Sequence, residues 1–366
     1  MNAAALTGAV RLHPGRPGEA ISGARPLLAA RIARGRSAAE LPALLGALFT
    51  LCSHAHLSTA RRAVSAALGE AALSTPAERG TLQAATARDQ VLRIAHDWPR
   101  LLPGAPPAEP TLLLRSCPLW REGFTAEERI GALRGWLAHC WLKEPVESWL
   151  GGLEADPLGH VQRWCENVDT PPARLLRSQA RALQALATPS RPLRLLDQPL
   201  AQMPRLARRM AEEPGFCARP DWNGAVAETG PWTRTIDPLP QPLHNAWMRL
   251  TARLVDVLRL ASPQGRDWLA EGALPLGHGE AIAWTEMARG LLVHWVRLED
   301  SPPGPRVADC RVLAPTEWNF HPQGVLAQAL AALRGGDASA QAARAAVAFD
   351  PCVEFTVETA REPAHA

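Results

Sequence analysis

The stretch Leu51-Cys52-Ser53-His54-Ala55-His56 places a cysteine and two histidines at the start of a predicted helix. The interpretation of the whole chain depends on whether these side chains bind a metal ion or pack into a core. From Leu57 onward, apolar residues recur every four positions with arginines between them. This spacing predicts an amphipathic helix that ends at Gly69. If the helix begins early, Cys52 and His56 lie four residues apart on one face. That face could hold a metal ion or simply pack into the core.

A second candidate segment, Phe349-Asp350-Pro351-Cys352, lies almost at the C-terminus, about three hundred residues from the first. Asp is favoured as a helix N-cap and Pro at the first helical position, so the segment predicts a helix with Cys352 in its first turn. The N-terminal end of a helix would favour the ionised sulfur, which is the form that binds metal. The alternation of Val353, Phe355 and Val357 is equally typical of a short strand.

Only a fold that returns its C-terminus to its N-terminal core can pair Cys52 with Cys352. The alternative interpretation is that both are small buried hydrophobic residues. No Cys-x-x-Cys pair occurs, so neither a disulfide framework nor a zinc finger is indicated. We expect the five remaining cysteines to pack in the core: Cys117, Cys140, Cys165, Cys217 and Cys310.

The composition is that of a soluble globular chain that does not bind nucleic acid. Hydrophobic residues make up 47% and charged residues 20% of the 366 residues, and the net charge is only +3. The N-terminus has no charged segment followed by a long apolar one, so no secretory signal is predicted. The longest apolar run, 41–52, is too short for a membrane span. We therefore expect a cytoplasmic, reduced protein.

The chain is predicted to be mostly helical, as a single domain over residues 1–366. Two strands are expected at 290–298 and 306–314, joined by a Pro-rich turn. Tryptophans gather in 98–164, and they fit either a core or a partner surface. A loop is expected at 103–107, and helices are expected at 28–32, 39–51, 57–68, 126–150, 172–187, 243–260, 325–333 and 340–347.

Six segments, in order along the chain, resemble motifs of the large subunit of nickel–iron hydrogenases. The first is the segment around Cys52 and His56, which is similar to Arg-x-Cys-Gly-x-Cys-x-x-x-His. The last is Asp350-Pro351-Cys352, which is similar to Asp-Pro-Cys-x-x-Cys-x-x-His. Between them lie segments that resemble Gly-Pro-x-x-Arg, Arg-x-x-Ala-Arg-x-x-Glu, Glu-Ala-Pro-Arg-Gly and Pro-Thr-Thr-Trp-Asn, at 230–234, 249–256, 286–290 and 315–319. Residues 84–200 carry no recognisable motif.

The departures from these motifs are informative. Hydrogenases hold nickel with four cysteines, and here two of the four positions are Phe49 and Phe355. The final histidine of the last motif is Glu358, and the proton-relay motif near residues 11–15 lacks its glutamate. Cys52 corresponds to a sulfur that bridges nickel and iron, and Cys352 to one that binds nickel alone. The pattern therefore resembles the HupK/HoxV-type hydrogenase maturation proteins, which are paralogues of the large subunit.

The resemblance implies an α+β, predominantly helical fold with short β elements around a central helical bundle. It also implies a non-enzymatic scaffold that transiently binds iron with cyanide and carbonyl ligands, without nickel. Cys52 and Cys352 are the expected metal ligands, and Arg289 and His56 are expected beside the bound group. A third ligand among His54, His56 and Glu358 stays open.

The partners implied are other maturation proteins, namely an iron-fragment donor complex and small chaperones, together with the hydrogenase large-subunit precursor.

Phe49 and Phe355 are expected to fill the volume of the missing sulfurs. The alternatives are a metal-free structural or chaperone paralogue and a hydrogenase-like metalloenzyme.

Overall fold

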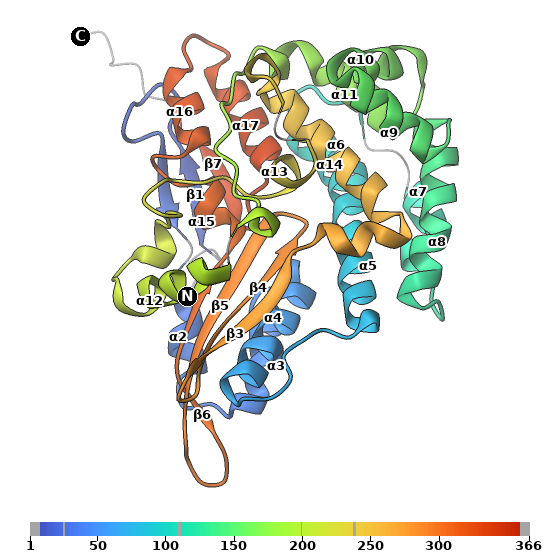
Figure 1. Cartoon of the computed structure of the whole chain (residues 1–366). Coiled ribbons are helices and arrows are strands. Elements are labelled where there is room, and N and C mark those ends of the chain that lie inside the picture. The colour runs from blue at the N-terminus through green and yellow to red at the C-terminus, as the bar shows by residue number, and fades with distance from the viewer. Residues whose placement is uncertain (1–7, 25, 108–110, 199, 237–238, 359–366) are drawn as a thin grey trace, which may run out of the picture.

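A four-stranded antiparallel sheet forms one end of the molecule in the computed structural model (Figure 1). The structure describes residues 8–24, 26–107, 111–198, 200–236 and 239–358. The strands follow one another in sequence order, so each is joined to the next by a hairpin. They are β3 (Glu271–Gly277), β4 (Glu280–Met287), β5 (Gly290–Glu299) and β6 (Arg306–Leu313).

Both faces of this sheet are covered. On one face, Ala281 and Ala283 of β4 belong to an apolar cluster with α2 (Leu28–Ala33), α3 (Leu41–Leu48) and α4 (Ser53–Ala67). On the other face, Ile282 and Trp284 pack with α12 (Met203–Glu212). Small side chains toward α4 let that helix lie close to the sheet, and this close packing brings the region of Cys52 to the β4–β5 turn.

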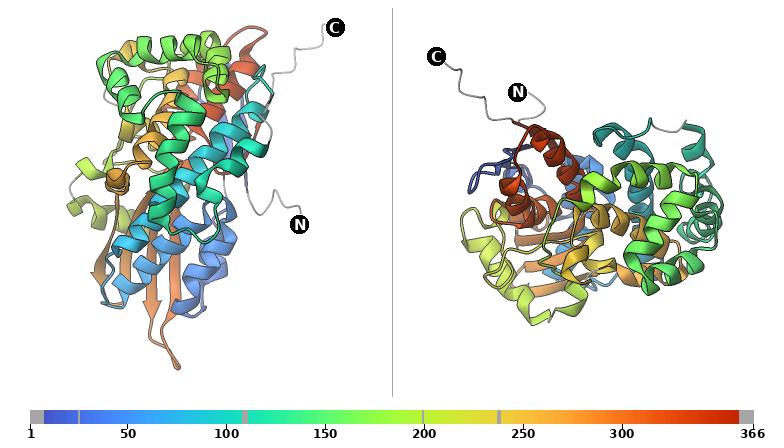
Figure 2. Two further views of the ribbon diagram at one scale, coloured as in Figure 1. Left: turned by 90° about the vertical axis from the view of Figure 1, so that its right-hand side faces the viewer. Right: turned by 90° about the horizontal axis from the view of Figure 1, so that it is seen from above.

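The largest apolar core lies among the remaining helices, which Figure 2 shows grouped above and beside the sheet. Its central element is α14 (Ala246–Leu260), in which only Arg259 is not buried. A helix that is buried on all sides requires neighbours on all sides. They include α5 (Pro76–Leu92), α8 (Ala126–Leu137), α9 (Val146–Ala155), α11 (Pro171–Gln184), α13 (Pro231–Thr235) and α17 (Ala338–Phe349). The same core also contains residues of α10 (Pro157–Asn167) and α16 (Val325–Ala332).

A second, three-stranded sheet joins the two ends of the chain. β1 (Ala9–Leu12) pairs antiparallel with β2 (Ile21–Ala24) and parallel with β7 (Glu354–Val357). This pairing returns the C-terminal segment to the N-terminal one, as a joint site for Cys52 and Cys352 requires.

The predicted α+β, predominantly helical class is confirmed, as are most of the predicted elements. The helix predicted at 126–150 is wrong as one element. A π turn at 138–142 and Lys143, with a positive φ of 63°, separate α8 from α9. Pro145, which has no backbone N–H, follows this break. The helix predicted at 39–51 likewise ends at Leu48, before a 3-10 turn at Thr50–Cys52.

The sequence also left β1–β4 without a prediction. Strand β4 is buried at every position after Glu280, so it lacks the alternation that would have marked it as a strand.

The five cysteines expected in the core pack as predicted, with Cys140 partly buried and the other four buried. Among the tryptophans of 98–164, Trp98, Trp141 and Trp149 are fully buried, which favours the core interpretation for them.

No single helix in the described ranges is long and apolar enough to cross a bilayer. One bent pair, Ala38–Leu48 with Thr50–Ala67, passes on length and composition but turns by 104° at its junction.

Candidate metal centre

Cys52 lies at the junction of two helical elements. It ends the 3-10 turn at Thr50–Cys52 and is the residue that precedes α4, with its N–H donating to the carbonyl oxygen of Phe49 at 3.0 Å. Its side chain is buried, with 6% exposed. His56 follows in the early part of α4 and lines the same cavity as Cys52, so these two residues share a face as predicted.

Cys352 does not lie in a helix, so the prediction of a helix that starts at Asp350 is wrong. Asp350 instead ends α17 in a left-handed conformation with φ of 52°. Pro351 cannot donate a hydrogen bond to continue the helix, and the chain turns into β7. The strand alternative for residues 353–357 is therefore confirmed. A backbone hydrogen bond fixes Cys352, whose N–H donates to Thr316 Oγ1 at 2.8 Å.

The two cysteines meet despite their separation in sequence. They belong to one apolar cluster with Ala55, Leu292 and Ala314. They also line one cavity of about 80 Å³, together with Pro26, Leu28, Leu48, Phe49, Thr50, Leu51, His56 and Val353. The side-chain hydrogen bond with Cys352 raises the pKa of Cys52 well above its usual value, and burial raises it further. The lowered pKa expected for a ligand thiol is therefore not found for Cys52.

Arg289 is the cation nearest to this thiol pair. It occupies the two-residue turn between β4 and β5, where Met287 pairs with Gly290. Arg289 Nη1 donates to Cys52 Sγ at 3.7 Å. The tight turn requires glycine at 290, because its φ is 131° and a Cβ there would lie 2.3 Å from Thr229 Oγ1. Arg289 and Cys52, both expected at the site, thus lie side by side.

Asp350 holds three arginines next to the thiols. Arg289 Nε lies 3.3 Å and Arg253 Nη2 lies 2.9 Å from Asp350 Oδ2, and Arg93 pairs with Oδ1. Burial alone would raise the pKa of Asp350, but the three positive charges outweigh it and lower the pKa. Arg93 also pairs with Asp97, with Nη1 2.8 Å from Oδ2, so the charges around the thiols form a network of buried ion pairs.

Asp89 is a site residue that the sequence did not reveal. It lies on α5, within the region that carried no motif, and it is half-buried. Burial raises its pKa to about 6, against the opposing charges of Arg289 and Arg88. The charges of Asp350 and Cys352 also raise it, so Asp89 faces the same site. Its only signal in sequence is its place in an amphipathic helix.

His56 is held by a second histidine. Its Nδ1 lies 3.1 Å from Nε2 of His294 in β5, and its ring stacks on Phe49 with centroids 4.0 Å apart. Burial lowers the pKa of His294 to about 3, so His294 is neutral at physiological pH. The stack confirms that Phe49 occupies space at the site. The same expectation for Phe355 is wrong, because Phe355 packs on the main core and does not line the cavity.

The remaining ligand candidates lie elsewhere. His54 does not line the cavity, and burial lowers its pKa. Glu358 is half exposed beyond β7, with Oε1 3.6 Å from Arg11 Nε and Oε2 3.6 Å from His13 Nδ1. Within the described ranges, no group of three or more His, Cys, Asp or Glu side chains is arranged to hold a metal ion. The protein thus offers a pair of soft ligands and a charged surround.

The fold places the chain in the structural class of hydrogenase large subunits. It matches the [NiFeSe]-hydrogenase of Dm. baculatum with a TM-score of 0.54 and 14% identity, over 91% of this chain and 93% of that one. It matches an NAD⁺-reducing [NiFe]-hydrogenase with a TM-score of 0.51 and 17% identity, over 89% and 90% of the two chains. At such identities the likeness concerns the fold alone.

The sequence relatives identify the family. The chain is 39% identical to the hydrogenase expression/formation protein HoxV of Cupriavidus necator, over 98% of this chain and 97% of the relative. It is 32% identical to the hydrogenase expression/formation protein HupK of Bradyrhizobium diazoefficiens, over 92% and 91%. No family model matches the chain. The chain belongs to the HoxV/HupK family of hydrogenase expression/formation proteins.

Proposed function

We propose that this protein is a non-enzymatic cytoplasmic scaffold of [NiFe]-hydrogenase maturation. It would transiently bind iron carrying two cyanides and one carbonyl, through Cys52 and Cys352, and pass it to the large-subunit precursor. One observation carries the proposal: thiols from opposite ends of the chain line one small, mostly apolar cavity beside Arg289.

The ligand types suit this cargo. Low-spin iron with cyanide and carbonyl is soft, and thiolate sulfur is a matching soft ligand. Two thiolates and three diatomic ligands leave one position open for handover. Because metal must displace the protons of two thiols, iron binding would release protons and would depend on pH.

The charge around the site also suits this cargo. Ferrous iron with two cyanides, one carbonyl and two thiolates is a net anion. Arg253 and Arg289, which lie around Asp350, would offset part of that negative charge. Arg289 can also donate hydrogen bonds to a cyanide nitrogen.

A two-thiol site supports transfer rather than retention, and it supports the absence of nickel. The four-sulfur nickel site of hydrogenases would need sulfur at positions 49 and 355, and Phe49 instead fills its place with a ring stacked on His56.

We propose that the partners are the iron-fragment donor complex, small chaperones and the large-subunit precursor. The main competing function is a metal-free chaperone, in which the two thiols serve packing only.

Infrared spectroscopy of protein purified with its maturation partners tests the proposal. We expect bands of bound cyanide and carbonyl in the wild-type protein, and their loss in both Cys52→Ala and Cys352→Ala. Cys165→Ala is the matched control, because it removes a buried thiol from the main core. Metal analysis should find iron and no stoichiometric nickel.

Absence of the bands from wild-type protein would favour the metal-free chaperone. Bands that survive both substitutions would show that the iron is held elsewhere. Stoichiometric nickel together with hydrogen turnover would instead favour an enzyme.

A further inference from the structure

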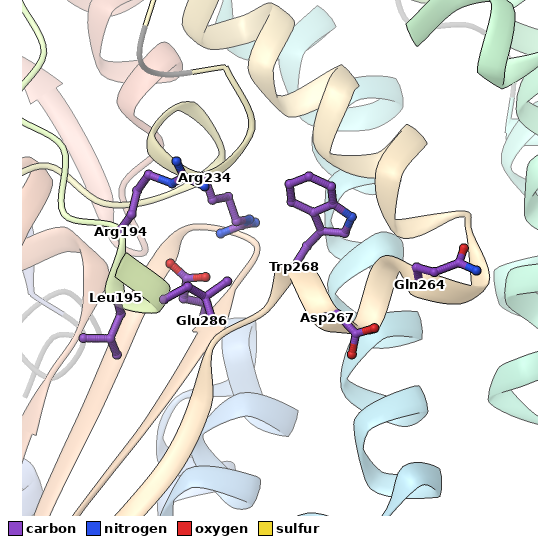
Figure 3. Close-up of a pocket in the computed structure, with 8 residues that line it drawn as sticks. Arg194, Leu195, Arg234, Gln264, Asp267, Trp268 and Glu286 are labelled. Carbon is purple, nitrogen blue, oxygen red and sulfur yellow. The ribbon is translucent and has the colours of Figure 1, made fainter. Parts of the chain in front are cut away.

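A larger cavity of about 300 Å³ lies apart from the thiol pair and shares no lining residue with its cavity. Segments from three parts of the chain meet there, namely the 3-10 turn at Leu195–Asp197, the 3-10 segment at Pro263–Trp268 and the end of β4 (Figure 3). The iron site described above makes no use of it. Its lining residues are Arg194, Leu195, Leu196, Arg234, Gln264, Asp267, Trp268 and Glu286.

Glu286 is the unusual group in this cavity. Its side chain is buried, with 1% of the residue exposed, and the backbone N–H of Ala270 donates to Oε2 at 3.2 Å. No Lys, Arg or His of the described part of the chain lies within 4 Å of its carboxylate. Burial raises the pKa of Glu286, although the charge of Arg234 opposes this. A buried carboxylate without a direct cationic partner costs free energy unless a ligand supplies one.

The arginines of the cavity are already engaged. Arg234 donates from Nε and Nη2 to the two oxygens of Asp256 at 2.9 and 2.6 Å, and from Nη1 to the carbonyl oxygen of Met287 at 3.1 Å. Arg194 Nη1 lies 3.3 Å from Asp197.

The other acidic group of the lining is also paired, since Asp267 accepts from Arg79 Nη2 at 3.0 Å. Among the described residues that line this cavity, Glu286 is thus the carboxylate with no cation within ion-pair distance.

The rest of the cavity is apolar, and so is part of its rim. Leu195 and Trp268 form walls, with Trp268 across from Glu286 and Arg234 in Figure 3. Leu196, which lines the cavity, is 57% exposed. An exposed leucine beside a buried charge is typical of a protein-binding surface, where apolar contact surrounds a central anchor.

We propose that this cavity receives a single arginine side chain from a partner protein, with its guanidinium paired to Glu286. The planar guanidinium is weakly hydrated and can bind a carboxylate through two parallel hydrogen bonds. Its aliphatic stem would lie along the apolar walls. A free cation would leave Leu196 exposed, whereas a docked protein surface would cover it. The proposal is independent of iron binding.

A short peptide provides the test. The probe is acetyl-Ala-Leu-Arg-Leu-Ala-amide, compared by calorimetry with the same peptide carrying citrulline, which keeps the shape and removes the charge. We expect the arginine peptide to bind the full-length protein more tightly than the citrulline peptide. Glu286→Gln should abolish the difference, with a loss of about tenfold or more in affinity for the arginine peptide.

The controls separate charge at this cavity from general effects. Gln at 286 keeps an oxygen that can accept from Ala270, so the variant should fold, and thermal unfolding checks this. Glu299→Gln removes an exposed carboxylate at the far end of β5 and should leave peptide binding unchanged.

Equal affinity for the two peptides, or equal losses in both variants, would overturn the proposal. Glu286→Gln should keep the infrared bands of the iron fragment, and Cys52→Ala should keep arginine binding, so failure of either proposal is recognisable by itself.

Discussion

At the scale of single residues, the thiol pair is surrounded by buried charges that constrain one another. Asp350 holds Arg93, Arg253 and Arg289, and Arg289 in turn reaches Cys52. Asp89 lies near the same arginine cluster, but its pKa is raised because the effect of burial outweighs the attraction of Arg289 and Arg88. A carboxylate of this kind destabilises the fold when it ionises. The site therefore holds a charge that stability alone would not select.

Asp89→Asn should stabilise the protein at neutral pH. The pKa of Asp89 is about 6 in the folded protein against 3.8 as the ordinary value, so the unfolded chain loses its proton first. Stability therefore falls as pH rises from about 4 to 6 and stays lower above that range, by about 2–3 kcal/mol at most. Urea denaturation at pH 4.5 and pH 7 measures the effect. The gain of the variant should be small at the lower pH and largest at pH 7.

Asp169→Asn is the control for this measurement, because the Asp169 side chain is 76% exposed in its ion pair with Arg174. Its effect should be within about 1 kcal/mol at either pH. A gain from Asp89→Asn that does not change with pH would contradict the titration.

At the scale of elements, the end of α17 and the short strand β7 position the second thiol. Asp350 turns the chain out of the helix, and β7 then pairs in parallel with β1 at four positions. Between them, Cys352 is fixed by its hydrogen bond to Thr316. A strand of this length is held by its partner and by packing rather than by its own propensity. The position of Cys352 thus depends on the pairing of the two ends of the chain.

Truncation after Val353 removes β7 and should expose Cys352. We expect alkylation of Cys352 by iodoacetamide, followed by mass spectrometry, to be faster by an order of magnitude or more, because local opening then needs less free energy. Truncation after Glu358 is the matched control, since it keeps β7 and the bond from the Glu358 N–H to the carbonyl oxygen of Leu12. Equal alkylation rates in the two truncated proteins would show that β7 does not hold the thiol.

At the scale of the whole molecule, the main core draws on residues from Val10 to Phe349. Its central helix α14 packs against α5, which precedes it by more than 150 residues, and against α17, which follows it. The region 84–200, which carried no motif, supplies much of this core through α5, α8 and α11. Its function in the described structure is to enclose α14 and to bring Asp89 and Arg93 to the site. A core that draws on distant segments is what the prediction of one domain over residues 1–366 requires.

Cooperative unfolding tests that prediction. Cys165 lies in the main helical core and Cys310 in strand β6 of the sheet, so each reports on one part of the molecule. We expect the protection of both thiols from alkylation to be lost at the same urea concentration, together with the far-ultraviolet circular dichroism signal. Loss of Cys310 protection well before that of Cys165 would indicate that the sheet and the helices unfold as separate units.

The sequence by itself determined the helices with clear periodicity, such as α4 and α14, the order of the hydrogenase-like motifs and the residues of the thiol pair. Periodicity records burial along a single element, and this can be read locally. Tertiary structure decided that Cys52 and Cys352 meet, that β7 replaces a helix, and that Asp89 and His294 belong to the site. These features depend on which elements pack together, and no local pattern encodes a contact between residues hundreds of positions apart. The same packing decided that Glu286 is buried without a counter-ion.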